Sequence, residues 1–126
     1  MYLALLPDAD SLAALKHFAP SLPDDAHVTV IHSNSYPLPP AIPAWAGSLT
    51  LETEALTHFG RGRVDVIKLK LSADLYRIRA EAEGILHAAG LPWSKQWPFS
   101  PHVTLGHMYN EALRPSTLRF DRMEWR

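Results

Sequence analysis

The sequence His-Val-Thr occurs twice in this chain, beginning at His27 and again at His102. In each copy the histidine and the threonine stand two residues apart in a β-prone run, so both side chains leave the same face of a strand. More than half of the chain separates the two copies. Only tertiary folding in a pseudo-two-fold arrangement brings two such faces together.

The elements expected around the two copies repeat in the same order. The first half reads as a strand over residues 2–6, a helix from Asp8 or Asp10 to Ala19, a histidine strand over 27–32, a proline-rich loop over 33–47 and a strand over 48–59. The second half reads as a strand over 63–71, a helix over 72–90, a histidine strand over 102–108 and a strand over 117–125. We therefore expect a single domain over residues 1–126, with lobe one over about 1–60 and lobe two over about 61–126.

Composition narrows the class of protein further. At 126 residues, 47% hydrophobic and 20% charged, the chain has an ordinary globular balance. A net charge of -1 argues against a duplex-DNA-binding protein, and the absence of cysteine excludes disulfides and thiolate chemistry. The apolar stretch over residues 2–6 is too short for a signal peptide or a membrane span, so we expect a cytoplasmic protein without a membrane partner.

Two histidines and two hydroxyls on one surface suit the cleavage of a phosphodiester. In an in-line displacement, one base accepts a proton on the entering side and one acid donates a proton on the leaving side. Histidine serves both roles near neutral pH, and hydroxyls can stabilise the charge on the non-bridging oxygens. A single His-x-Thr would more often be an ordinary strand segment. Two copies at equivalent places favour a functional site at His27, Thr29, His102 and Thr104.

The segments His-Val-Thr-Val at 27–30 and Pro-His-Val-Thr-Leu-Gly at 101–106 resemble the paired motifs of the two-histidine (2H) phosphoesterase superfamily. That superfamily includes 2'-5' RNA ligases, cyclic nucleotide phosphodiesterases and small phage enzymes. The resemblance implies an α+β bilobal fold, with antiparallel sheets lining a central cleft and helices outside, and chemistry without a metal or another cofactor. His27 and His102 then take the acid and base roles, in an order left open, and Thr29 and Thr104 hold the phosphate.

The short chain leaves little room for the extra helices of ligase-type members. This favours cyclic nucleotides or cyclic oligonucleotides as substrates, and by analogy a phage anti-defence role. Two alternatives remain open. One is RNA end processing or 2'-5' RNA ligation, and the other is non-catalytic binding of a nucleotide or RNA.

Aromatic residues close to the motifs are candidates for binding the substrate. Aromatic faces stack nucleobases, and a lysine beside them can meet a phosphate. The candidates are Tyr36, Trp93, Lys95, Trp97 and Phe99. Each aromatic ring is equally well interpreted as a core side chain that fills the end of a small hydrophobic core.

His32 and His107 each stand five residues after a motif histidine. In a regular strand this odd offset turns them to the opposite face, so we expect neither in the phosphodiester site. A four-histidine metal site would require the strands to break. His17, His58 and His87 have no partner pattern and are interpreted as ordinary surface or core residues.

Overall fold

The structure is a computed structural model that describes residues 1–35, 41–59, 64–95 and 98–126. Its elements follow the repeated order that the sequence predicts: strand, helix, histidine strand and strand, twice. They are β1 (Tyr2–Pro7), α1 (Ala9–Phe18), β2 (Val28–His32), β3 (Leu49–Phe59), β4 (Val64–Leu69), α2 (Ala73–Ala88), β5 (His102–Gly106), the short 3-10 helix η1 (Glu111–Leu113) and β6 (Thr117–Trp125).

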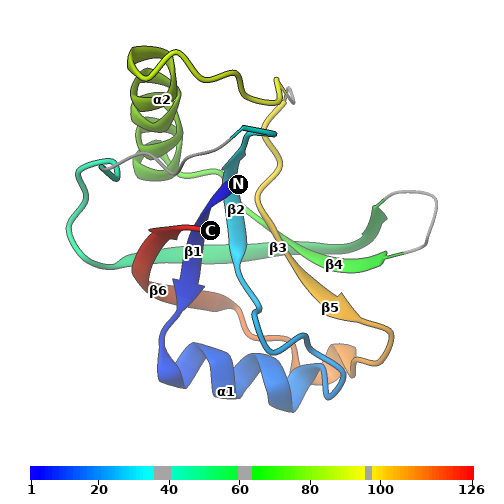
Figure 1. Ribbon diagram of the computed structural model, residues 1–126. Coiled ribbons are helices and arrows are strands. Elements are labelled where there is room, and N and C mark those ends of the chain that lie inside the picture. Colours follow the sequence, from blue (N-terminus) through cyan, green and yellow to red (C-terminus); the bar gives the residue numbers. More distant parts are fainter. Residues whose placement is uncertain (36–40, 60–63, 96–97) are drawn as a thin grey trace.

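The six strands form one closed barrel in the order β1-β2-β5-β4-β3-β6, and all neighbours are antiparallel (Figure 1). Exchanging β1 with β4, β2 with β5 and β3 with β6 reproduces the same set of pairings, so the topology has a two-fold pseudosymmetry. The α+β class with antiparallel strands is confirmed. The two predicted sheets are continuous with each other, and they join where β2 meets β5 and where β3 meets β6.

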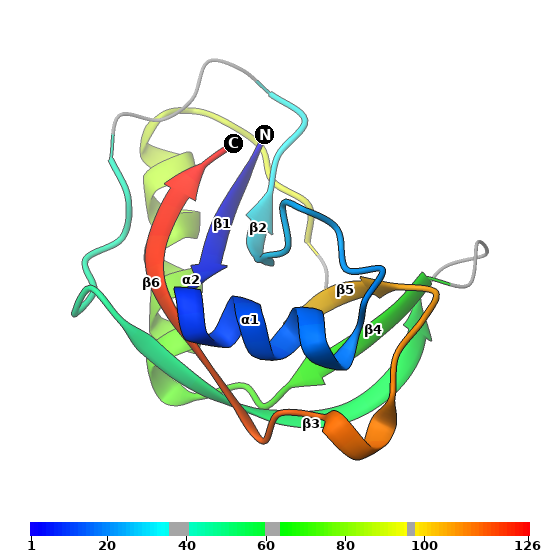
Figure 2. The same ribbon diagram turned by 90° about the horizontal axis from the view of Figure 1, so that it is seen from below.

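Side-chain caps begin both α-helices. Asp8 accepts a hydrogen bond from the backbone N–H of Ser11, and Ser72 accepts one from that of Leu75. Such caps satisfy donors that the first turn of a helix leaves unpaired. The apolar faces then bury Leu15 and Phe18 from α1, and Leu75, Ile78, Ala82 and Leu86 from α2. Figure 2 shows α1 and α2 on different sides of the strands.

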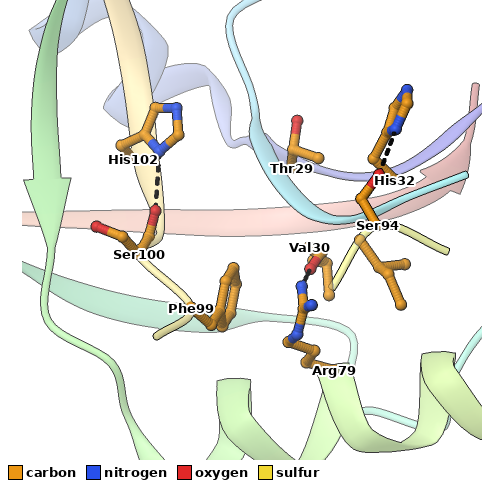
Figure 3. A pocket seen from close by; sticks show the side chains of 9 residues that line it. Thr29, Val30, His32, Arg79, Ser94, Phe99, Ser100 and His102 are labelled. Atoms are coloured by element: carbon orange, nitrogen blue, oxygen red, sulfur yellow. Dashed lines mark hydrogen bonds between the residues drawn. The ribbon is translucent and has the colours of Figure 1, made fainter. Parts of the chain in front are cut away.

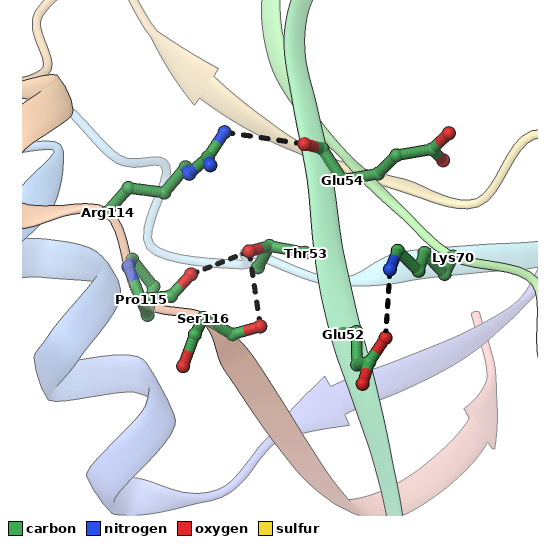
Figure 4. Close-up of polar contacts among 7 residues, drawn as sticks. All are labelled: Glu52, Thr53, Glu54, Lys70, Arg114, Pro115 and Ser116. Carbon is green, nitrogen blue, oxygen red and sulfur yellow. Dashed lines mark hydrogen bonds and ion pairs between the residues drawn. The ribbon is translucent and has the colours of Figure 1, made fainter.

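Polar contacts fix β3 at the place where it leaves β6 and continues with β4 (Figure 4). The hydroxyl of Thr53 donates to the carbonyl oxygens of Pro115 at 2.7 Å and Ser116 at 3.2 Å. Lys70 forms an ion pair with Glu52, at 3.1 Å from Nζ to Oε2. Lys70 therefore belongs to the polar contacts around β3, together with Glu52 and Thr53.

No helix in the described part of the chain is both long and apolar enough to span a membrane.

Candidate active site

The two histidine strands lie next to each other in the barrel. β2 and β5 pair antiparallel at Val28 and Val103, and both valine side chains are completely buried. Because successive side chains on a strand point to opposite faces, the residues on either side of each valine point away from this buried layer. The valine pair therefore sets the positions of the motif residues around it.

The four motif side chains form a two-by-two array on the opposite face. The antiparallel register places Thr29 beside His102 and His27 beside Thr104, so the histidines stand on one diagonal. Diagonal neighbours in such a sheet are about 7–8 Å apart, which leaves room for a phosphate between two imidazoles. All four side chains are partly exposed. The fold thus brings the predicted catalytic residues to one place.

Each motif histidine is held in the same way. Nδ1 of His27 lies 2.7 Å from the carbonyl oxygen of Asp25, and Nδ1 of His102 lies 2.8 Å from that of Ser100. A carbonyl oxygen can only accept, so Nδ1 carries the proton and, in the neutral ring, Nε2 is the nitrogen that carries the lone pair. Nε2 of His27 lies 3.1 Å from the hydroxyl of Thr29, which donates to it in that state.

Tyr2 packs against His27, a contact that the sequence analysis did not predict. The two rings are stacked, with centroids 4.9 Å apart and planes inclined by 23°. Tyr2 lies on β1, next to β2. The stacking restricts the plane of the His27 ring, so the phenol acts as a support for the imidazole.

A cavity of about 120 Å³ opens beside the array (Figure 3). Thr29 and His102 form part of its wall, which connects it directly to the two motifs. The remaining lining comes from the end of β2, from α2 and from the segment before β5: Val30, Ile31, His32, Arg79, Ser94, Phe99 and Ser100.

The expectation that His32 faces away from the site is wrong, because β2 is not regular. Thr29 and His32 are three positions apart, but their partners on β1, Ala4 and Tyr2, are only two apart. The extra residue, Val30, forms a β-bulge that reverses the alternation of side chains. His32 therefore returns to the face of Thr29 and lines the same cavity.

Arg79 of α2 also lines the cavity, and it was not among the site residues expected from the sequence. It is 7% exposed, and its Nη1 donates to the carbonyl oxygen of Val30 at 2.6 Å. Its guanidinium lies over the Phe99 ring, 4.7 Å from the centroid, and its Nε lies 3.5 Å from Oε1 of Glu83. Burial lowers the pKa of Arg79, and the charge of Glu83 opposes this shift. A sequence signal existed, because position 79 falls within the buried stripe of the helix.

The predicted substrate-binding residues fall in different places. Phe99 is buried and lines the cavity, whereas Trp93 is partly buried against the hydrophobic core. Lys95 is exposed. Tyr36 and Trp97 lie outside the described residues.

His107 lies apart from the motif array. β5 ends at Gly106, whose positive φ of 85° turns the chain, and His107 lines a different cavity together with His17 and Asp65. Asp65 also forms an ion pair with His58. Among the residues that the structure describes, no group of three or more His, Cys, Asp or Glu side chains could hold a metal ion.

The barrel with its two-fold pseudosymmetry is similar to a solved structure. The crystal structure of Escherichia coli LigT complexed with 3'-AMP matches this chain with a TM-score of 0.60 and 18% identity. The match covers 94% of this chain and 82% of LigT. No protein-family model and no curated protein matches the chain. The fold that the motif resemblance implied is therefore confirmed.

Proposed function

We propose that this chain is a metal-independent phosphodiesterase that cleaves a nucleotide phosphodiester with His27 and His102 as acid and base. The observation that carries the proposal is the pairing of β2 with β5 at Val28 and Val103, which gathers two histidines and two threonines on one face. The matched Nδ1–carbonyl bonds support it, because they leave Nε2 of each ring as the atom for proton transfer.

The proposed reaction is an in-line displacement at phosphorus. One histidine takes a proton from water or a ribose hydroxyl as its oxygen bonds to phosphorus, and the other gives a proton to the departing oxygen as its bond to phosphorus breaks. The pair then holds the same number of protons in total as before, with base and acid exchanged. Thr29 and Thr104 donate hydrogen bonds to the non-bridging oxygens, where negative charge accumulates.

Cyclic nucleotides or cyclic oligonucleotides are the proposed substrates. A 2',3'-cyclic phosphate opened by water gives a nucleoside 2'- or 3'-phosphate, and the structurally similar LigT was crystallised with 3'-AMP. A phage-type role against a host signalling nucleotide is a further prediction of this proposal.

RNA end processing or 2'-5' ligation is the second candidate, and the likeness to LigT favours it. Product analysis on cleaved tRNA halves separates the two enzyme candidates. Non-catalytic binding of nucleotide or RNA is the third candidate. It predicts that ligand is recovered unaltered after long incubation.

The direct test is a screen of 2',3'-cyclic mononucleotides and of cyclic di- and trinucleotides in excess EDTA. Mass spectrometry identifies the products. We expect cleavage of at least one of these substrates, at the same rate with and without the chelator. Activity that disappears in EDTA would contradict the metal-independent mechanism, and ligation of tRNA halves without cleavage of cyclic nucleotides would favour the second candidate.

A further inference from the structure

We propose that His32 and Ser94 form a subsite for a second phosphate group of the substrate, next to the phosphate that reacts. This inference deepens the proposed function and rests on it, because the proposed function places the first phosphate among the four motif residues.

The bulge at Val30 places His32 on the reactive face at a defined distance from Thr29. Because the bulge makes three positions span the length of two, the separation along the strand is about 7 Å. That is the scale on which one nucleoside unit separates consecutive phosphates. The buried Arg79 fixes this geometry through its bond to the Val30 carbonyl.

The loop before β5 fixes His32 from the other side. The backbone N–H of Ser94 donates to the carbonyl oxygen of His32 at 2.8 Å. The Ser94 hydroxyl also lies 3.2 Å from Nδ1 of His32. Strand and loop thus present an imidazole and a hydroxyl together at one end of the cavity, as Figure 3 shows.

The polar wall of the cavity suits an anion. Every polar side chain that lines it can donate a hydrogen bond, and none is a carboxylate: Thr29, His32, Arg79, Ser94, Ser100 and His102. The one acidic group beside Arg79, Glu83, is not part of the lining. In a chain whose net charge is -1, this local separation of donors from carboxylates favours a negatively charged group.

The size of the cavity limits what it can hold. The volume of about 120 Å³ is small, because pockets for whole ligands typically measure about 300–1,000 Å³. The cavity fits one group of a larger molecule.

The test compares the binding of two probes, adenosine 3'-phosphate and adenosine 3',5'-bisphosphate, by titration calorimetry. We expect the wild type to bind the bisphosphate about tenfold more tightly, the value of one charge-assisted hydrogen bond. In His32→Ala this ratio should fall to about twofold or less, while the affinity for the monophosphate changes little. His32→Lys should keep the preference, because a lysine ammonium group also donates hydrogen bonds to phosphate. Ser94→Ala gives a second, independent reduction of the ratio.

His107→Ala is the matched control, since His107 has the same offset from its motif but lines another cavity. It should bind both probes as the wild type does, and thermal unfolding of each variant checks that it is folded.

Equal binding of both probes by the wild type would overturn the subsite. Equal weakening of both probes by His32→Ala would overturn it too, since that result indicates a base or ribose contact. If this assay fails while cyclic nucleotides are still cleaved, only the subsite is refuted. If binding follows the prediction but no substrate is cleaved, the proposed phosphodiesterase is refuted instead.

Discussion

One backbone carbonyl oxygen holds each motif histidine from two residues earlier in the chain, at Asp25 for His27 and at Ser100 for His102. The bond fixes both the tautomer and the plane of the ring before any substrate arrives. Such preorganisation lowers the cost of reaching the transition state, because the groups need not be reoriented during the reaction. In the proposed reaction, the two threonines are donors toward the phosphate oxygens.

Replacing Thr29 or Thr104 by valine tests that role. Valine keeps the shape and removes the hydroxyl, so each variant should lower kcat by about 10²–10³-fold, as the loss of one donor to a developing oxyanion does. Steady-state kinetics on the substrate found in the screen measures this effect. Thr117→Val, on the exposed start of β6, is the control and should leave kcat unchanged. A variant at Thr29 or Thr104 with wild-type kcat would contradict the assigned role.

Two glycines should respond to alanine in opposite directions. Gly106 has a φ of +85°, and an added Cβ would lie 2.5 Å from the carbonyl oxygen of Ser21, so Gly106→Ala should lower the free energy of unfolding by about 1–3 kcal/mol. Gly84 lies inside α2 with open space around it, so Gly84→Ala should raise that free energy by about 0.5–1 kcal/mol. Urea denaturation measures both changes. Equal effects at the two positions would contradict this explanation.

At the scale of elements, the N-terminus of α1 links stability to pH. The backbone N–H of Ser11 donates to the Asp8 carboxylate and lowers its pKa below the usual 3.8, and the charge of Arg119 adds to the shift. The ionised form of Asp8 is therefore favoured by folding. Its contribution to stability is present above pH 3.8 and is lost as the pH falls through the lower pKa of the folded state.

Asp8→Asn removes this charge and keeps a side chain that caps helices well. We expect the variant to be less stable than the wild type at pH 7, and the gap to shrink as the pH falls below 3.8. Thermal unfolding followed between pH 7 and pH 3 measures the gap. A gap that stays constant or widens toward acid pH would refute the linkage.

The helices and strands differ in how far the sequence predicts them. Alternating residues and helix caps are local signals, so the order of the elements and the shared face of each His-x-Thr followed from the sequence. The bulge in β2 is not a local signal, because Arg79, from a distant helix, binds the Val30 carbonyl that the bulge presents. The sequence analysis assumed a regular alternation of side chains along β2. It therefore predicted His32 on the face opposite Thr29, which is wrong. The separation of His32 from His107 likewise depends on tertiary contacts.

At the scale of the whole molecule, the closed barrel joins the two halves of the chain around one hydrophobic core. β1 pairs with β6 and β3 also pairs with β6, so strands from the two repeats alternate around part of the barrel. One hydrophobic cluster contains side chains from both helices and from all six strands. The lobes predicted over about 1–60 and 61–126 thus share a core.

We expect one cooperative unfolding transition for this reason. Calorimetry should give equal calorimetric and van't Hoff enthalpies, as it does for a two-state protein. Gly106→Ala should shift the whole transition to lower temperature without splitting it. Two separate transitions would instead indicate lobes that unfold independently.

The central claim is that His27 and His102 together perform acid and base catalysis. The most direct measurement is the rate of phosphodiester cleavage in excess EDTA by the wild type, by His27→Ala, by His102→Ala and by the double variant. His107→Ala serves as the control. We expect wild type and control to cleave equally, each single variant to lose at least about 10²-fold, and the double variant to lose little more, because the two groups act as a unit. Cleavage that survives in the double variant would contradict the central claim.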